Sequence, residues 1–538
     1  MTSTLQMALL LFTVLVVVAI AARRLDIAPS ILLVVAGVGL ALIPRLPRLE
    51  LTPELVLLGV LPPLIYSAGV QMSWREFRFN LRPIALFAIG CVIFTACAIA
   101  AAAHWLLGLP LAVAFVLGAI VAPPDVVAPL AMARRLGLPR RLIVVLEGEG
   151  LANDATALIL YRFAVAAVST GLFSLTEATG TFTLIIIGEI AYGIIIGWLS
   201  LRLRRWARDP RVEITLSLMT PYVAFWVPAE LGGSGVLATV AAGLYVSWNG
   251  PLLIPAATRL QGIFFWDLVV YYLEGLIFLV MGLQARTLIE RMNEFSLQDL
   301  VSGILLIVGV AIVARFIWVF PAVYVPRWLS PALAKRDPSP PWQWAFLLAF
   351  VGVRGVVSLA AALALPFYTA NGAPFPYRDL ILFITFGTIV VTLIGQGLLL
   401  PRLVLLLRLN CDSIVERREE REAEHRARRD ALKVAKLRLD ELASGNDIPE
   451  AVLSHLQTRH DYRASRLHNP SSKADGTRMA ALGPGLRSEL IETERKFIFG
   501  LLQEGQITDE SRRRMERELD LEEASVACQK EGGIEPPL

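Results

Sequence analysis

The sequence is poor in the residues that build soluble catalytic and metal sites. It contains only four cysteines and five histidines among its 538 residues. Cys91 and Cys97 lie inside one apolar run and Cys411 and Cys528 in a polar region, so neither a disulfide framework nor a metal-binding spacing emerges. Four of the histidines fall in that polar region without the spacing of a zinc site. We expect no enzymatic activity and no cofactor, and no basic nucleic-acid-binding pattern stands out.

Charged residues are also scarce over most of the chain. Residues 1–407 contain 27 Lys and Arg and 20 Asp and Glu, whereas residues 408–538 contain 23 and 26. Apolar runs of about eighteen residues or more predict membrane-spanning helices. About thirteen such runs lie near 5–22, 29–44, 52–71, 83–105, 110–133, 141–168, 180–201, 212–229, 234–248, 260–284, 300–325, 342–366 and 379–407. The sequence predicts an all-α polytopic membrane domain over 1–407 and a charged, mostly helical cytoplasmic tail over 408–538.

Positive charge is distributed unevenly between the two alternating sets of loops. Cytoplasmic loops are enriched in Lys and Arg. The set of loops with few positive residues contains only Arg45, Arg48, Arg286, Arg291 and Arg378. The rich set contains Arg23, Arg24, Arg75, Arg78, Arg82, Arg134, Arg135, Arg140, Arg141, Arg202, Arg204, Arg205, Arg208, Arg211, Arg259, Arg327, Lys335 and Arg336. We therefore expect an external N-terminus, a cytoplasmic C-terminus and a location in the plasma (inner) membrane.

Asp154 is the most informative charge, because it lies in the middle of the span near 141–168. A charge at bilayer depth costs about 2.5–3.5 kcal/mol on insertion scales, so it normally faces a partner or a hydrated cavity. Helical spacing places Glu147 and Gly150 on the same face as Asp154, and Glu149 on the face of Asn153. The glycine is expected to leave room for water or an ion.

The span around Asp125 is expected to be broken. Pro123, Pro124 and Pro129 each remove a backbone donor and disturb a helical turn. Unpaired carbonyls at membrane depth are tolerated where they line a cavity, and transporters use such breaks to build ion sites. A proline kink in an ordinary packed helix is the alternative. A second interruption, Gly352-Val-Arg-Gly355, lies late in the domain, and two separated interruptions are typical of inverted repeats.

Three motifs resemble those of the monovalent cation/proton antiporter-1 family, which contains bacterial sodium/proton antiporters. They are Gly118-Ala-Ile-Val-Ala-Pro-Pro-Asp-Val-Val-Ala128, Glu147-Gly-Glu-Gly-Leu-Ala-Asn-Asp-Ala-Thr-Ala157 and Gly352-Val-Arg-Gly-Val-Val-Ser-Leu-Ala360. They occur in the family's order over some 400 residues. Broken helices that cross, and a homodimer, are what this resemblance implies.

The resemblance also implies roles for individual residues. Asp154 would carry the transported monovalent cation or the proton, and Asp125 would line the same site. Asn153 would brace the broken helix, and Glu149 would form a structural ion pair with Arg354.

The chain departs from the family's pattern at three places. The family often has Thr-Asp-Pro where this chain has Pro124-Asp125-Val126, a serine at the position of Gly150, and an acid at the position of Ser67. The first two departures each remove an oxygen that could bind a cation, and all three bear on which cation is selected.

Four other membrane charges are candidates for secondary roles. Glu147 shares the face of Asp154, and Asp267 and Glu274 are seven residues apart on one face of a later span. Arg315 is interpreted either as a cation that packs between helices or as a charge partner, with packing favoured.

These observations predict a secondary antiporter that exchanges a monovalent cation, sodium above potassium or lithium, for protons across the lipid bilayer. A potassium/proton antiporter of the same build is the nearest alternative. A receptor that signals through its tail would not need converging membrane charges, and a channel should show a repeated filter sequence. Only one lysine, Lys335, occurs before residue 408, in a loop. Since no buried lysine offers a second proton carrier, we expect electroneutral exchange.

Overall fold

The computed structural model describes residues 2–25, 27–43, 51–171, 175–290, 296–369, 372–445, 449–468, 491, 493–494 and 518–524. It divides into two compact units, residues 1–416 and 417–538. Eight helical segments in the described residues are long and apolar enough to cross a membrane. The remaining predicted spans fall on shorter or interrupted helices. The predicted all-α membrane fold is confirmed.

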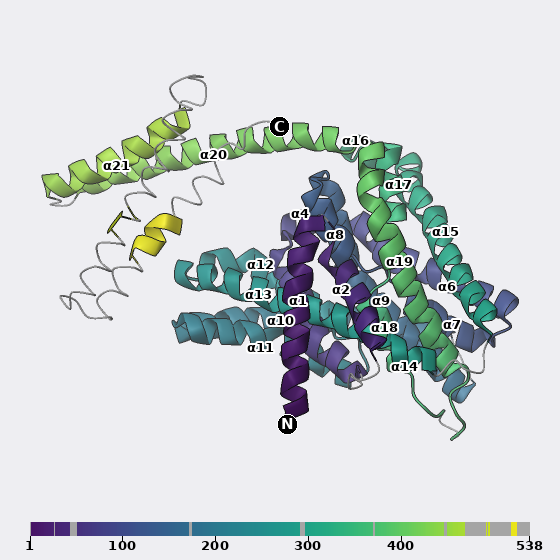
Figure 1. Ribbon diagram of the computed structural model, residues 1–538. Helices are drawn as coiled ribbons and strands as arrows, with labels where there is room; N and C mark the ends of the chain where they lie inside the picture. Colours follow the sequence, from purple (N-terminus) through teal and green to yellow (C-terminus); the bar gives the residue numbers. More distant parts are fainter. Residues whose placement is uncertain are drawn as a thin grey trace. The chain divides into compact units, whose positions relative to one another are not determined.

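The first unit is built from helices that pack along apolar faces (Figure 1). Its elements are α1 (Thr2–Leu25), α2 (Pro29–Ala41), η1 (Leu55–Val60), α3 (Leu61–Gln71), α4 (Trp74–Phe79), α5 (Leu81–Ala85), η2 (Leu86–Cys91), α6 (Val92–Leu107), α7 (Leu111–Val121), α8 (Val127–Arg135), α9 (Arg140–Thr170), α10 (Leu175–Ala207), α11 (Pro210–Glu230), α12 (Val236–Leu253), α13 (Ala256–Leu283), α14 (Ala285–Glu290), α15 (Leu297–Leu329), α16 (Pro331–Arg336), α17 (Trp342–Phe350), α18 (Val356–Leu363) and α19 (Arg378–Leu406).

Small residues allow several of these helices to approach closely. A Cβ atom at Gly118 in α7 would lie 2.3 Å from the carbonyl oxygen of Ala96 in α6. A Cβ atom at Gly282 in α13 would lie 2.4 Å from the carbonyl oxygen of Val34 in α2. Since real Cβ atoms do not approach so near, these glycines set the α6–α7 and α2–α13 distances.

Around the central helices, α7 packs against both α6 and α9, and α15 packs against α6, α17 and α19. In Figure 1, α15 and α19 run side by side in green. The two interrupted elements, α7/α8 and α17/α18, therefore reach the same region as α9, the helix that contains Asp154.

The second unit contains most of α20 (Asn410–Gly445) and all of α21 (Glu450–His468). Lys436 and Asp461 form a 3.4 Å ion pair between these helices, and the His460 ring lies 2.9 Å from the carbonyl oxygen of Leu432. The two helices thus form a hairpin, in agreement with the helical character expected of the tail.

Candidate ion-exchange site

Two interrupted helices meet directly. The break between α7 and α8 covers residues 122–126 and contains Pro123 and Pro124, whose missing backbone donors end the first half-helix. The break between α17 and α18 covers residues 351–355. The backbone N–H of Asp125 donates to the carbonyl oxygen of Val353 at 2.6 Å, which joins the two breaks. This is the arrangement of crossing half-helices that the sequence predicts.

Asp125 lies at the N-termini of both second half-helices. Its Oδ1 accepts a hydrogen bond from the backbone N–H of Val127, the first residue of α8, at 2.9 Å. The amide of Val356, the first residue of α18, also lies against this carboxylate. Helix N-termini carry a partial positive charge that favours an anion. Asp125 is therefore fixed in place by the ends of two helices.

Gly355 is required for this contact. A Cβ atom on Gly355 would lie 1.7 Å from Asp125 Oδ2. The carboxylate therefore occupies the space that any other side chain at position 355 would need. The close approach explains the glycine that follows the arginine in the second break.

Asp154 lies in α9 and is only partly buried. Its carboxylate is near enough to that of Asp125 for the two charges to interact. No residue in the described part of the chain donates a hydrogen bond to it. Asp154 is thus a membrane carboxylate that remains available to a proton or a cation.

Asn153 connects α9 to the first break. It is fully buried, and its Nδ2 donates to the carbonyl oxygen of Pro124 at 2.6 Å. Its Oδ1 is buried without a partner among the described residues. The side chain therefore holds the break against α9 and leaves one buried acceptor oxygen without a partner among the described residues.

The structure pairs Glu149 with Arg315. Arg315 Nη1 and Nη2 donate to the two carboxylate oxygens at 2.5 and 2.8 Å, and both side chains are at most 2 % exposed. Arg315 Nε also donates to the carbonyl oxygen of Leu348 at 3.0 Å. The bidentate geometry suits an arginine held between two helices.

The expected Glu149–Arg354 pair was therefore wrong. Arg315 lies on the helix that packs against α6 and α17, and its planar fork takes both oxygens of Glu149. Arg354 is held instead by its backbone, which donates to Thr392 Oγ1 at 3.0 Å. Its Nε and Nη1 are buried without a partner in the described residues, although Glu149 lies within electrostatic range.

Gly150 does not leave an open space beside Asp154, contrary to expectation. A Cβ atom at this position would lie 2.1 Å from a methyl carbon of Val126. Val126 thus fills the volume that a larger side chain at 150 would occupy. A larger side chain at position 150 and the valine at position 126 would therefore compete for the same space.

The remaining acidic candidates lie in three different environments. Glu147 forms a 2.5 Å ion pair with Arg134, and Asp267 is exposed. Glu274 is partly buried, and its charge is near enough to interact with Asp125 and Arg134. Glu274 therefore lies near the crossing.

The buried carboxylate of Glu189 was not among the candidate site residues. Glu189 in α10 accepts hydrogen bonds from the backbone N–H groups of Ser234, Gly235 and Leu237 and from the Ser234 hydroxyl, so it caps α12. The Gly-Gly-Ser-Gly run at 232–235 before an apolar span could have indicated a helix start that needs an anion.

Comparison with known proteins shows the family to which this chain belongs. Residues 10–406 match the family described as "Sodium/hydrogen exchanger, transmembrane". The chain belongs to the sodium/hydrogen exchanger family. An exchanger from Mycobacterium tuberculosis, described as an uncharacterised Na(+)/H(+) exchanger, is 34% identical over 94% of this chain and 93% of its own length. The Na(+)/H(+) antiporter ApNhaP of Aphanothece halophytica is 32% identical over 70% of this chain and 68% of its own.

The fold of this exchanger also agrees with a solved structure. The sodium proton antiporter MjNhaP1 from Methanocaldococcus jannaschii at pH 8 matches 75% of this chain and 99% of its own, with a TM-score of 0.60 and 18% identity. The crossing breaks and the carboxylates of this exchanger therefore lie in a membrane antiporter. The prediction of a secondary antiporter is confirmed.

Proposed function

We propose that this exchanger moves sodium and protons in opposite directions by competition at Asp154. The observation that carries the proposal is the contrast between the membrane acids. Glu149 is fully held by Arg315, and Asp125 is fixed at two helix N-termini, whereas Asp154 receives no hydrogen bond from the described residues. A carboxylate can bind a proton or a metal cation, and each excludes the other.

Two other oxygen-bearing side chains are candidates to share an alkali cation with Asp154. Asp154 supplies its carboxylate, Asp125 lies within electrostatic range, and the unpartnered Oδ1 of Asn153 belongs to the neighbouring residue. Carboxylate and amide oxygens suit hard cations. Arg354 lies in the second break, where Glu149 is within electrostatic range of its guanidinium, and an arginine does not act as a proton carrier.

The movement of sodium is coupled to the movement of protons because both ions bind at the same carboxylate, Asp154. In secondary transporters, access to a midplane site alternates between the two sides as one group of helices moves against another. If only the cation-loaded or protonated form of Asp154 makes that change, each sodium moved in one direction is balanced by one proton in the other. The exchange would then be electroneutral.

Several further expectations stay part of the proposal. The arginine-rich loops support a cytoplasmic tail over 408–538 and an external N-terminus in the plasma membrane. Homodimer assembly is retained from the family resemblance. Glu274 is assigned a secondary role near Asp125.

Sodium is favoured over potassium as the principal cation. The descriptions of the matched family and of ApNhaP both name sodium as the exchanged cation. A relative from Bacillus pumilus, 35% identical over 68% of this chain and 56% of its own, is described as an antiporter of sodium, potassium, lithium and rubidium. A broader cation range is therefore the second candidate, and the receptor alternative is abandoned.

The test is exchange in proteoliposomes that contain the purified full-length protein. Proton movement is followed while sodium, lithium and potassium are added in turn. Wild type should respond most strongly to sodium, Asp154→Asn should not respond although it reconstitutes equally, and Asp125→Asn should be severely impaired. Wild-type rates from Asp154→Asn would remove Asp154 from the mechanism.

A further inference from the structure

Three arginines converge on one aspartate at the arginine-rich ends of α5, α9 and α15. Asp337 accepts hydrogen bonds from Arg82 Nη2 at 2.8 Å, Arg141 Nη2 at 2.7 Å and Arg327 Nη2 at 2.8 Å. Arg327 Nε also donates to the Asp337 backbone oxygen at 3.0 Å. Three positive charges share one carboxylate, so the cluster has an excess of two positive charges. We call these four residues the arginine cluster.

The arginine cluster still contains donors that lack an acceptor. Nε and Nη1 of Arg82 are buried and have no partner among the described residues. The indole N–H of Trp344, in the adjoining part of α17, is also buried without one in the same part of the chain. A buried donor left unpaired costs free energy, about 1–3 kcal/mol for a neutral group and more for a charged one. These donors predict a ligand or solvent that supplies acceptor oxygens.

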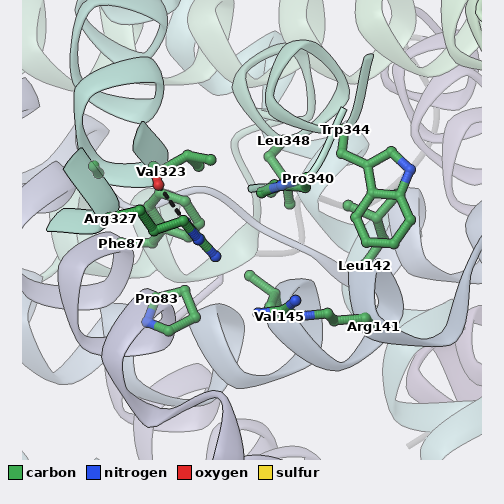
Figure 2. Close-up of a pocket in the computed structure, with 11 residues that line it drawn as sticks. Pro83, Phe87, Arg141, Leu142, Val145, Val323, Arg327, Pro340, Trp344 and Leu348 are labelled. Atoms are coloured by element: carbon green, nitrogen blue, oxygen red, sulfur yellow. Dashed lines mark hydrogen bonds between the residues drawn. The ribbon is translucent and has the colours of Figure 1, made fainter. Parts of the chain in front are cut away.

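A pocket with mainly apolar walls lies between Arg327 and Trp344 (Figure 2). Arg141 also lines it, together with apolar side chains such as Phe87, Leu142 and Val145. The empty volume is about 410 Å³ with the open mouth included, and the space inside is about 30 Å³. It can therefore receive part of an amphiphile beside its headgroup, but not a whole acyl chain.

The neighbouring surface has the character of a membrane interface. Trp328 and Trp342 are 81% and 55% exposed, at the adjacent ends of α15 and α17. Tryptophan is enriched where the bilayer meets water. The pocket and the arginine cluster thus lie where lipid headgroups are expected.

We propose that the arginine cluster and its pocket bind an anionic phospholipid. The phosphate would lie at the edge of the pocket formed by Pro83, next to Arg82, and accept hydrogen bonds from Arg82 Nε and Nη1, while the glycerol end would enter the pocket near Trp344. A guanidinium pairs well with phosphate oxygens, and the cytoplasmic leaflet is the anionic one. The assignment to that leaflet depends on the orientation proposed above, whereas binding itself does not.

Such a lipid would stabilise the two helices that hold the exchange site. Arg141 lies in the first turn of α9, the helix that also contains Glu149 and Asp154. α15 contains both Arg315 and Arg327. These helices are therefore joined in mid-membrane by Glu149–Arg315 and at their ends through Asp337. A lipid that neutralises the excess charge would strengthen the second connection.

The test measures binding rather than transport, so it can fail while sodium/proton exchange stands. Purified full-length protein in a non-ionic detergent is titrated with phosphatidylglycerol, with phosphatidylcholine or with inorganic phosphate, and the melting temperature is recorded. Phosphatidylglycerol alone should raise it. Arg82→Gln should weaken that response about ten-fold, as expected for one lost charge-assisted contact.

Two further variants make the result specific. Arg202→Gln removes the same charge from an exposed arginine near the C-terminal end of α10 and should respond like wild type. Trp344→Phe keeps an aromatic wall, removes the indole donor and should weaken the response a few-fold, which tests the pocket even if Arg82→Gln fails to fold. An equal effect of phosphatidylcholine or of inorganic phosphate, or an equal loss in Arg202→Gln, would overturn the proposal.

Discussion

Breaking the ion pair between Glu149 and Arg315 should destabilise the membrane domain more than removing any exposed charge. Both side chains are at most 2 % exposed and share two hydrogen bonds of 2.5 and 2.8 Å. Removing one partner of such a buried pair leaves the other charge uncompensated, at a cost of about 3–5 kcal/mol. We expect Glu149→Gln or Arg315→Gln alone to lower the melting temperature strongly.

The double variant distinguishes a direct contact from two independent effects. Glu149→Gln/Arg315→Gln should be much less destabilised than the sum of the single losses, because neither charge is left without its partner. Glu149→Gln/Arg354→Gln serves as the matched control, since Arg354 is also buried but makes no hydrogen bond to Glu149 in the described residues. Thermal unfolding of the purified variants in detergent measures both cycles. Additive losses for Arg315, with a strong coupling for Arg354 instead, would refute this assignment.

Three other changes test the geometry and the stoichiometry. Gly355→Ala should abolish exchange, because its Cβ would lie 1.7 Å from Asp125 Oδ2, whereas Gly180→Ala in α10, with open space around it, should exchange sodium normally in proteoliposomes. Gly150→Ser should lower the melting temperature and impair transport, because the serine side chain would collide with Val126. The double variant Gly150→Ser/Val126→Ala should melt near the wild-type temperature, and a double variant as unstable as Gly150→Ser alone would mean that the two positions do not compete for space. Sodium-driven exchange should be insensitive to a potassium/valinomycin potential, since one proton balances one sodium, and a sodium-driven current on a solid-supported membrane would contradict that count.

The sequence predicts the membrane domain well because its signals are local. Apolar length determines the spans, and Pro123 and Pro124 remove the donors that α7 would need to continue. The same reasoning locates Asp154, since a charge inside an apolar run requires an explanation wherever the neighbouring helices lie. Helical spacing also turns Glu149 away from Asp154, and the structure pairs Glu149 with Arg315.

The partner of Glu149 could not be obtained in this way. Glu149 and Arg315 are 166 residues apart, and spacing within one helix says nothing about which of two arginines on other helices lies opposite. The resemblance favoured Arg354, while the packing of α15 brings Arg315 to Glu149. The role of Gly150 was misread for a similar reason, because Val126, which fills its space, comes from the far side of the break.

The central claim, competition between sodium and a proton for Asp154, is tested most directly by proton release on sodium binding. Purified protein in weakly buffered detergent solution, at a pH where the site is protonated, is mixed with sodium chloride while pH is recorded and bound sodium is measured. Because cation binding must displace the proton, wild type should release about one proton per sodium bound and Asp154→Asn none. Equal release from Asp154→Asn, or sodium binding to wild type without proton release, would contradict the account.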